Sequence, residues 1–136
     1  MFQHNVAVVT VCHNQLEMTK KFLASLEEAC KDSTNYSLYI LDNGSADGTT
    51  QYLEEYAQKR KEVATGLQMG CAMSSSENLG FAGGNNRLLE YILNTDADKF
   101  SGILLINNDT LVTKEALDHL VEVAHSSPEI AATGPM

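Results

Sequence analysis

The chain has no tryptophan, only three cysteines and two prolines in 136 residues, and half as many basic as acidic residues. The cysteines form no C-x-x-C pair, which favours free thiols in a reducing compartment over a disulfide framework or a zinc site. A net charge of −9 argues against nucleic acid as a partner, because phosphate backbones bind basic faces. No run reaches the roughly 18 to 20 apolar residues that cross a bilayer, and no signal peptide is seen. We expect one soluble domain, cytoplasmic by default.

Three short apolar runs each end in a cluster of small polar residues. The runs cover residues 6–11, 38–41 and 103–106, and the clusters are C-H-N at 12–14, D-N-G-S at 42–45 and N-N-D-T at 107–110. The stretches between the runs carry apolar residues at helical spacing. This alternation predicts an α/β domain with a mostly parallel sheet and flanking helices. Because ligands of such sheets bind at the carboxyl ends of the strands, we expect the clusters to converge on one site.

Other elements are predicted from local signals. Asn14 and Glu17 have the spacing of a capping box, which would open the first helix. A further strand is expected within 67–73, and a glycine-rich loop at 77–86 should lead into a helix. The last helix is expected to start at Thr113, followed by a short strand at 130–132. Such an edge strand would be exposed or used for association.

The glycine-rich loop has two interpretations that the residues alone leave open. Gly80, Gly83 and Gly84 would permit close approach of the backbone to a ligand, and the N–H groups of the following helix attract anions. Alternatively, the glycines serve a tight turn that needs positive φ angles. The loop matches neither G-x-G-x-x-G nor G-x-x-x-x-G-K-[ST], so neither standard phosphate fingerprint applies.

Polar residues at the strand ends suggest the chemistry of the site. Asp109 follows a buried strand, and Mg²⁺ or Mn²⁺ prefers oxygen ligands, so we favour metal contact over a role in capping the turn. Asp42 and Asn43 can read the donors of a base or ribose, or form an Asx turn with Gly44. Asn14 can cap its helix, contact a ligand, or do both.

Four motifs occur in order, each at an expected strand end. They are V-T-V-C-H-N at 9–14, L-D-N-G-S-A-D-G-T at 41–49, N-L-G-F-A-G-G-N-N at 78–86 and L-I-N-N-D-T at 105–110. Together they resemble the nucleotide-binding half of a family 2 glycosyltransferase with the Rossmann-like GT-A fold, over about residues 6–135. The third motif is most similar to the rhamnosyltransferase-like branch. The resemblance implies that residues 1–136 bind the donor for an inverting, metal-assisted sugar transfer from a nucleotide diphosphate to a saccharide or lipid-linked acceptor.

The resemblance also implies roles for individual residues. Those beside the base would be Thr10, His13, Asn14 and Asp42, with Asn43 and Gly44 shaping that wall. Those along the ribose, diphosphate and donor sugar would be Asn78, Gly80, Gly83, Gly84 and Asn85. The family's D-x-D metal motif would correspond to Asn107, Asn108 and Asp109, with Asp109 binding the Mg²⁺ or Mn²⁺ that bridges the diphosphate. Asn107 replaces the first acid of that motif.

Members of this family continue well past the equivalent of Met136, into a half that binds the acceptor and supplies the general base. We identify no such base here, so the catalytic residues stay unassigned. The chain is interpreted as truncated. The alternatives are a fragment of a split enzyme and a non-catalytic nucleotide-sugar-binding module, and association into a homo-oligomer stays open. A lipid-linked acceptor would place the protein at the membrane periphery. A sugar nucleotidyltransferase is disfavoured, because residues 10–16 lack the Gly, Lys and Arg of its basic loop.

Overall fold

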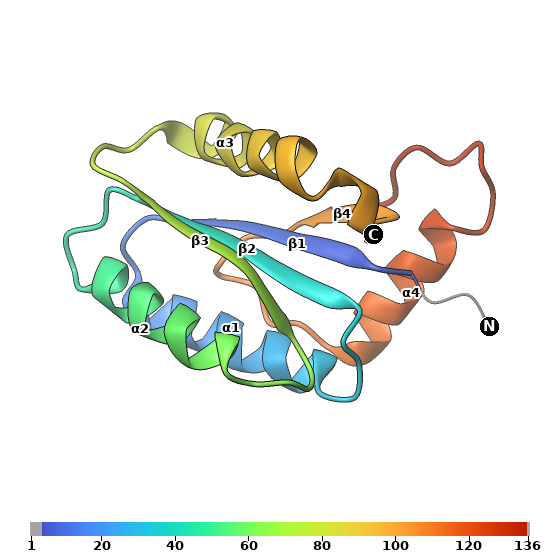
Figure 1. The fold of residues 1–136 in the computed structure, drawn as a ribbon, viewed down its shortest axis with the longest axis horizontal. Helices are drawn as coiled ribbons and strands as arrows, with labels where there is room; N and C mark the ends of the chain where they lie inside the picture. Colours follow the sequence, from blue (N-terminus) through green and yellow to red (C-terminus); the bar gives the residue numbers. More distant parts are fainter. Residues whose placement is uncertain (1–3, 136) are drawn as a thin grey trace.

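The computed structural model describes residues 4–135. Its four strands form one parallel sheet in the order β3-β2-β1-β4, with helices on both faces (Figure 1). The strands are β1 (Val6–Cys12), β2 (Tyr36–Asn43), β3 (Gln68–Ser75) and β4 (Gly102–Leu105). The helices are α1 (Leu16–Cys30), α2 (Thr49–Lys61), α3 (Gly80–Thr95) and α4 (Lys114–Ala124), with a short 3₁₀ helix at Ala97–Lys99. The predicted α/β class with a parallel sheet is confirmed.

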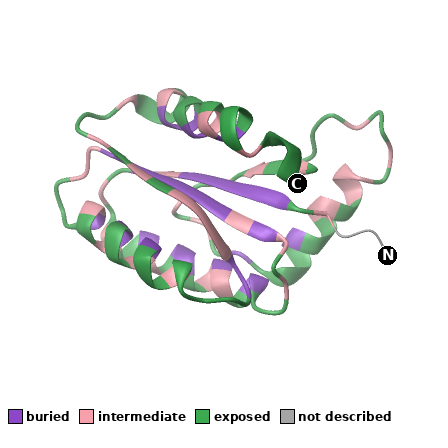
Figure 2. Ribbon diagram, viewed as in Figure 1, coloured by how far each residue is buried: buried purple, intermediate pink, exposed green. Residues whose placement is uncertain are grey.

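The central strands β1 and β2 are almost entirely buried, as Figure 2 shows for the middle of the sheet. Both faces of a parallel sheet are covered by helices, which explains why these strands are continuous apolar runs. Their register pairs Val6 with Tyr36 and Cys12 with Asp42, so the two strands end side by side. This shared end brings the first two polar clusters together.

Alternate residues of β1 face two different helix layers. Val6, Val8 and Cys12 belong to the core that includes residues of α1, α2 and α4. Ala7 and Val9 face the other way, into a smaller core formed with α3. The side chains of β1 therefore alternate between the two faces of the sheet, and each face has its own core.

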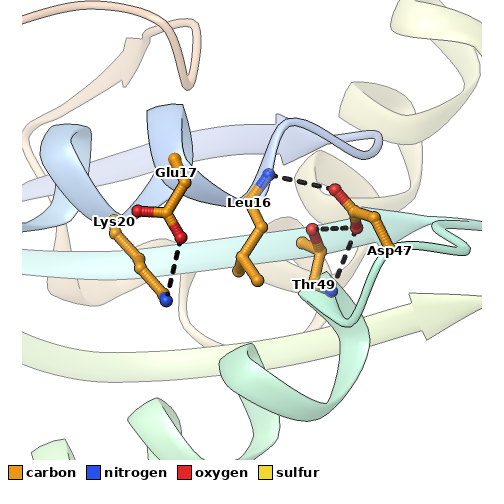
Figure 3. A network of polar contacts seen from close by, with 5 residues as sticks. All are labelled: Leu16, Glu17, Lys20, Asp47 and Thr49. Atoms are coloured by element: carbon orange, nitrogen blue, oxygen red, sulfur yellow. Dashed lines mark hydrogen bonds and ion pairs between the residues drawn. The ribbon is translucent and has the colours of Figure 1, made fainter.

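The predicted capping box at the start of α1 is wrong. The N-cap position is Gln15, whose side chain makes no capping bond, and Asn14 and Gln15 both adopt left-handed φ angles of 54° and 58°. Glu17 pairs instead with Lys20 at 3.1 Å. The first amide of α1 donates to the carboxylate of Asp47 at 3.0 Å, which also accepts from Thr49 (Figure 3). A residue 31 positions away thus caps α1, and no local pattern could indicate it.

Two further expectations are corrected and two are confirmed. The expected loop at 77–86 is helical from Gly80 onward, because α3 starts there. No strand forms at 130–132 among the described residues; a turn closed by the Ile130 amide and the Ser127 carbonyl precedes an exposed segment. The strand expected within 67–73 exists, and Thr113 caps α4 by accepting from the Ala116 amide at 3.2 Å. Within residues 4–135, no helix has the length and apolar character needed to span a membrane.

Candidate functional site

A polar hollow of about 280 Å³ lies at the carboxyl ends of β1 and β2, beside the turn that follows β4. Its lining consists of Val11, His13, Asn43, Asn78, Gly80, Phe81, Asn107, Asn108 and Asp109. The three polar clusters and the glycine-rich motif therefore each contribute to one hollow. Its volume is near the lower end of the roughly 300–1,000 Å³ typical of ligand pockets, so a large ligand would extend onto the open surface.

Asn43 joins three segments at the base of this hollow. Its side chain is 2% exposed and makes two hydrogen bonds to the start of α3. The carboxamide oxygen accepts from the Leu79 amide at 2.7 Å, and the amide nitrogen donates to the Gly80 carbonyl at 3.0 Å. Both groups of the side chain are satisfied, so Asn43 fixes where α3 begins.

The carbonyl of Asn43 also fixes the state of His13. This carbonyl lies 2.8 Å from Nδ1 of His13 and can only accept, so Nδ1 carries a proton. Nε2 of the ring lies 3.3 Å from the side-chain amide nitrogen of Asn14. His13 is exposed at the hollow, which leaves its ring face available to a ligand.

The start of α3 faces the hollow. Gly80 is the first helical residue, and its amide donates to the Asn78 side chain at 2.9 Å. The Leu79 and Gly80 amides are already bonded, so the later N–H groups of the first turn, together with the positive end of the helix dipole, favour an anion at this position. Gly84 lets the helix lie close to β1, because a Cβ there would be 2.9 Å from a side-chain carbon of Val11. The glycine-rich motif thus serves helix packing as well as the hollow.

The turn at 107–109 offers oxygen atoms to the hollow. Asn107 and Asp109 are exposed, whereas Asn108 is half-buried and donates to the Thr19 hydroxyl at 3.0 Å. Carboxylate and amide oxygens suit Mg²⁺ or Mn²⁺, and one carboxylate with phosphate and water is a sufficient set for Mg²⁺. Within residues 4–135, no group of three or more His, Cys, Asp or Glu side chains forms a metal cage. The exposed oxygen atoms of Asn107 and Asp109 at the hollow suit a cation that shares its coordination with a ligand.

Several residues singled out from the sequence lie outside the lining of the hollow. They are Thr10, Asn14, Asp42, Gly44, Gly83, Gly84 and Asn85. Thr10 is fully buried, and its hydroxyl has no hydrogen-bond partner among residues 4–135. Asp42 is 2% exposed, and its two oxygens accept from the hydroxyls of Ser45 and Thr50. Asp42 therefore holds the 42–45 turn in this conformation, and its contact with a base stays a prediction.

The remaining members of this group also connect protein segments. The side-chain oxygen of Asn14 accepts from the Ala46 backbone amide at 2.8 Å. The backbone amide of Asn14 donates to the Ser45 hydroxyl at 2.7 Å. Gly44 has a φ of +72°, and a Cβ there would lie 2.9 Å from the backbone of Glu77. Asn85 is buried and donates to the Phe81 carbonyl within α3. These contacts fix the loops around the hollow.

Sequence reasoning missed two residues of the lining, Val11 and Phe81. Phe81 is 65% exposed in the first turn of α3. Its signal was present in the third motif, where a large apolar residue follows a glycine next to the polar clusters. Two other hollows, of about 370 and 860 Å³, lie between β4, α4 and residues 130–135. They are mainly apolar and lack a comparable set of convergent polar groups.

The parallel sheet, the two helix layers and the polar hollow at the carboxyl edge define a Rossmann-like α/β domain of the GT-A type. The family model described as "Glycosyl transferase family 2" matches residues 7–136, and the chain belongs to this family. The family membership predicted from the four motifs is confirmed. No curated protein matches the chain.

Solved structures of a mannosyltransferase and of S. aureus TarS share this fold. Mannosyltransferase PcManGT from Pyrobaculum calidifontis, in complex with GDP-Man and Mn²⁺, is 17% identical, with a TM-score of 0.69 over 93% of this chain and 34% of that chain. S. aureus TarS 1–349 is 21% identical, with a TM-score of 0.61 over 90% of this chain and 32% of that chain. The same TarS fragment in complex with UDP gives a TM-score of 0.62. The chain spans about a third of the length of these proteins.

Proposed function

We propose that this chain is the donor-binding domain of a glycosyltransferase that uses a nucleotide-diphospho-sugar. The observation that carries the proposal is the meeting of the 107–109 turn and the start of α3 at one polar hollow. Family membership supports it, as do the GDP-Man and Mn²⁺ in one structural neighbour and the UDP in another. Within this proposal, the donor site belongs to the rhamnosyltransferase-like branch and the protein works in the cytoplasm or at the membrane periphery.

The charge of the hollow favours a metal-assisted reaction. Among the described residues, the lining includes no lysine or arginine, and Asp109 is its one carboxylate. A negative charge about 4 Å from a phosphate oxygen costs about 4 kcal/mol at an effective dielectric constant of about 20. The amides at the start of α3 offset only part of this repulsion. A divalent cation between Asp109 and a diphosphate would remove it.

The residues then divide into three groups by role. Asp109 and Asn107 would hold Mg²⁺ or Mn²⁺, which supplies Lewis-acid neutralisation of the diphosphate leaving group. Asn78, Gly80 and the amides of the first turn of α3 would bind the diphosphate. His13 and Asn43 would lie beside the base, on a wall that the 42–45 turn supports.

The remaining predicted residues would act around these groups. Gly83, Gly84 and Asn85 would keep α3 in place near the donor sugar, and Asn14 would hold the two loops beside the base. Thr10 is fully buried in β1 and would support the base-binding wall from within the sheet. Transfer to a saccharide or lipid-linked acceptor with inversion would require a general base, which we do not assign in this chain.

A binding module without turnover is the second candidate. The chain spans about a third of the length of the solved structures that share its fold, so donor binding and turnover by this chain are separate questions. Donor hydrolysis or transfer by this chain would support the enzyme. Binding of the donor without turnover would support the module.

Calorimetric titration tests the donor site directly. UDP, dTDP, GDP and CDP are each titrated with and without Mn²⁺ into the wild type, Asp109→Ala and the control Asp98→Ala, which removes an exposed carboxylate near the other end of α3. We expect one nucleotide to bind in a Mn²⁺-dependent manner, and this binding to be lost only in Asp109→Ala. Binding that is equal in all three proteins would remove Asp109 from the site. No binding of any nucleotide to the wild type would contradict the donor site itself.

A further inference from the structure

The half-buried Asn108 connects the 107–109 turn to helix α1. Its side-chain amide donates to the hydroxyl of Thr19 at 3.0 Å. Thr19 is fully buried on α1, and Cys12, the last residue of β1, is also fully buried. Burial raises the pKa of the Cys12 thiol to about 12, so this thiol stays protonated at neutral pH. One buried hydroxyl therefore joins the first part of α1 to the turn after β4.

The turn has few other anchors. The Ile106 amide makes the last backbone bond to β1, at 3.0 Å from the Val9 carbonyl. Apart from Asn108, the first hydrogen bond to α1 after Ile106 is made by the Val112 amide, which donates to the Ser25 hydroxyl at 3.0 Å. Among the described residues from 107 to 111, Asn108 is the one whose side chain bonds to another element. The direction of the turn between residues 106 and 112 thus depends on the contact with Thr19.

We propose that Thr19 is a positioning residue for the cation-binding turn, and that Asn108 is its anchor and not a ligand contact. With the Asn108 side chain held against α1, its two neighbours Asn107 and Asp109 are both exposed at the hollow. Holding oxygen donors in place before a cation arrives reduces the entropy lost on binding. The inference rests on the proposed function, because it assumes that Asp109 binds the cation.

Thr19→Val tests the inference, because valine keeps the shape of threonine and removes the hydroxyl that Asn108 needs. Thr19→Ser keeps the hydroxyl. Thr95→Val is the matched control, because Thr95 is exposed and its hydroxyl donates to the Tyr91 carbonyl of its own helix, away from the hollow. Free Mn²⁺ is measured by electron paramagnetic resonance with the nucleoside diphosphate that binds the wild type most tightly. Nucleotide affinity is measured separately in EDTA.

We expect Thr19→Val to weaken Mn²⁺ binding about 2- to 10-fold, the range that corresponds to one lost hydrogen bond. Thr19→Ser should restore the affinity, and Thr95→Val should leave it unchanged. Nucleotide affinity in EDTA should not change in Thr19→Val, Thr19→Ser or Thr95→Val, which separates positioning of the cation from a general loss of structure. Asn108→Ala, on the half-buried side of the contact, should reproduce the loss even if Thr19→Val folds poorly.

Unchanged Mn²⁺ affinity in Asn108→Ala would overturn the inference while leaving the donor site intact. An equal loss of nucleotide affinity with and without Mn²⁺ would also overturn it, because the defect would then be structural. A wild type that binds nucleotide without any dependence on Mn²⁺ would overturn the proposed metal site, and this inference with it. The wild-type and variant measurements therefore distinguish the two failures.

Discussion

Replacing Asn43 by alanine should loosen the start of α3 and destabilise the domain. The substitution removes the acceptor of the Leu79 amide and the donor to the Gly80 carbonyl, at 2.7 and 3.0 Å. A typical buried hydrogen bond contributes about 0.5–1.5 kcal/mol, so the two together correspond to about 1–3 kcal/mol. For a domain of this size, each kcal/mol lowers the melting temperature by about 3–5 °C. A loss of about 2 kcal/mol would therefore lower it by about 6–10 °C.

Urea unfolding followed by circular dichroism measures the loss for Asn43→Ala, and hydrogen exchange locates it. The control is Asn86→Ala, which removes an exposed amide from the same helix. Amides in the first turn of α3 should exchange faster in Asn43→Ala only. If both variants unfold with the same free energy within about 0.5 kcal/mol, the margin expected for surface substitutions, the role assigned to Asn43 is refuted.

Three other substitutions test separate parts of the structure. Thr10→Val should raise the free energy of unfolding, measured in urea, by about 1 kcal/mol, because it removes a buried hydroxyl that has no partner among the described residues. A lower free energy of unfolding would mean that the hydroxyl does have a hydrogen-bond partner. Gly84→Ala should lower the free energy of unfolding by about 1–3 kcal/mol and weaken nucleotide binding, because the new Cβ would lie 2.9 Å from a side-chain carbon of Val11. The control Gly134→Ala, whose Cβ would meet no atom within 4 Å, should change neither quantity. Hydrogen bonds from the Thr49 hydroxyl and from the backbone amides of Leu16 and Thr49 lower the pKa of Asp47 below its usual 3.8. The ionised Asp47 therefore stabilises the fold above pH 3.8, and this stabilisation is lost as the pH falls through the lowered pKa. Asp47→Asn should therefore flatten the fall in melting temperature below about pH 4, and an unchanged profile would contradict this.

The sheet could be predicted because β1 and β2 are buried on both faces. Burial on both faces requires continuous apolar runs, and such runs are visible in the sequence without any partner. The convergence of the polar clusters then followed from the parallel topology alone. The sequence therefore sufficed to predict where the hollow lies and most of the residues that line it.

The errors arose where contacts between distant segments decide the local structure. Glycine disfavours helices, so Gly83 and Gly84 suggested a loop, whereas close packing of α3 on Val11 makes a glycine necessary within the helix. The cap of α1 comes from Asp47, and local spacing cannot indicate a partner 31 residues away. The contacts of Asp42 with the Ser45 and Thr50 hydroxyls were likewise not visible from the sequence, and its role at the base stays a prediction.

The most direct test of the donor site is where Mn²⁺ binds. In a nuclear magnetic resonance titration with nucleoside diphosphate present, substoichiometric Mn²⁺ broadens the signals of nearby amides. The account predicts that broadening is centred on the turn at 107–109 and the first turn of α3, and that Asp109→Ala abolishes it. Broadening centred on the acidic residues of α4, or unchanged in Asp109→Ala, would contradict the proposed site.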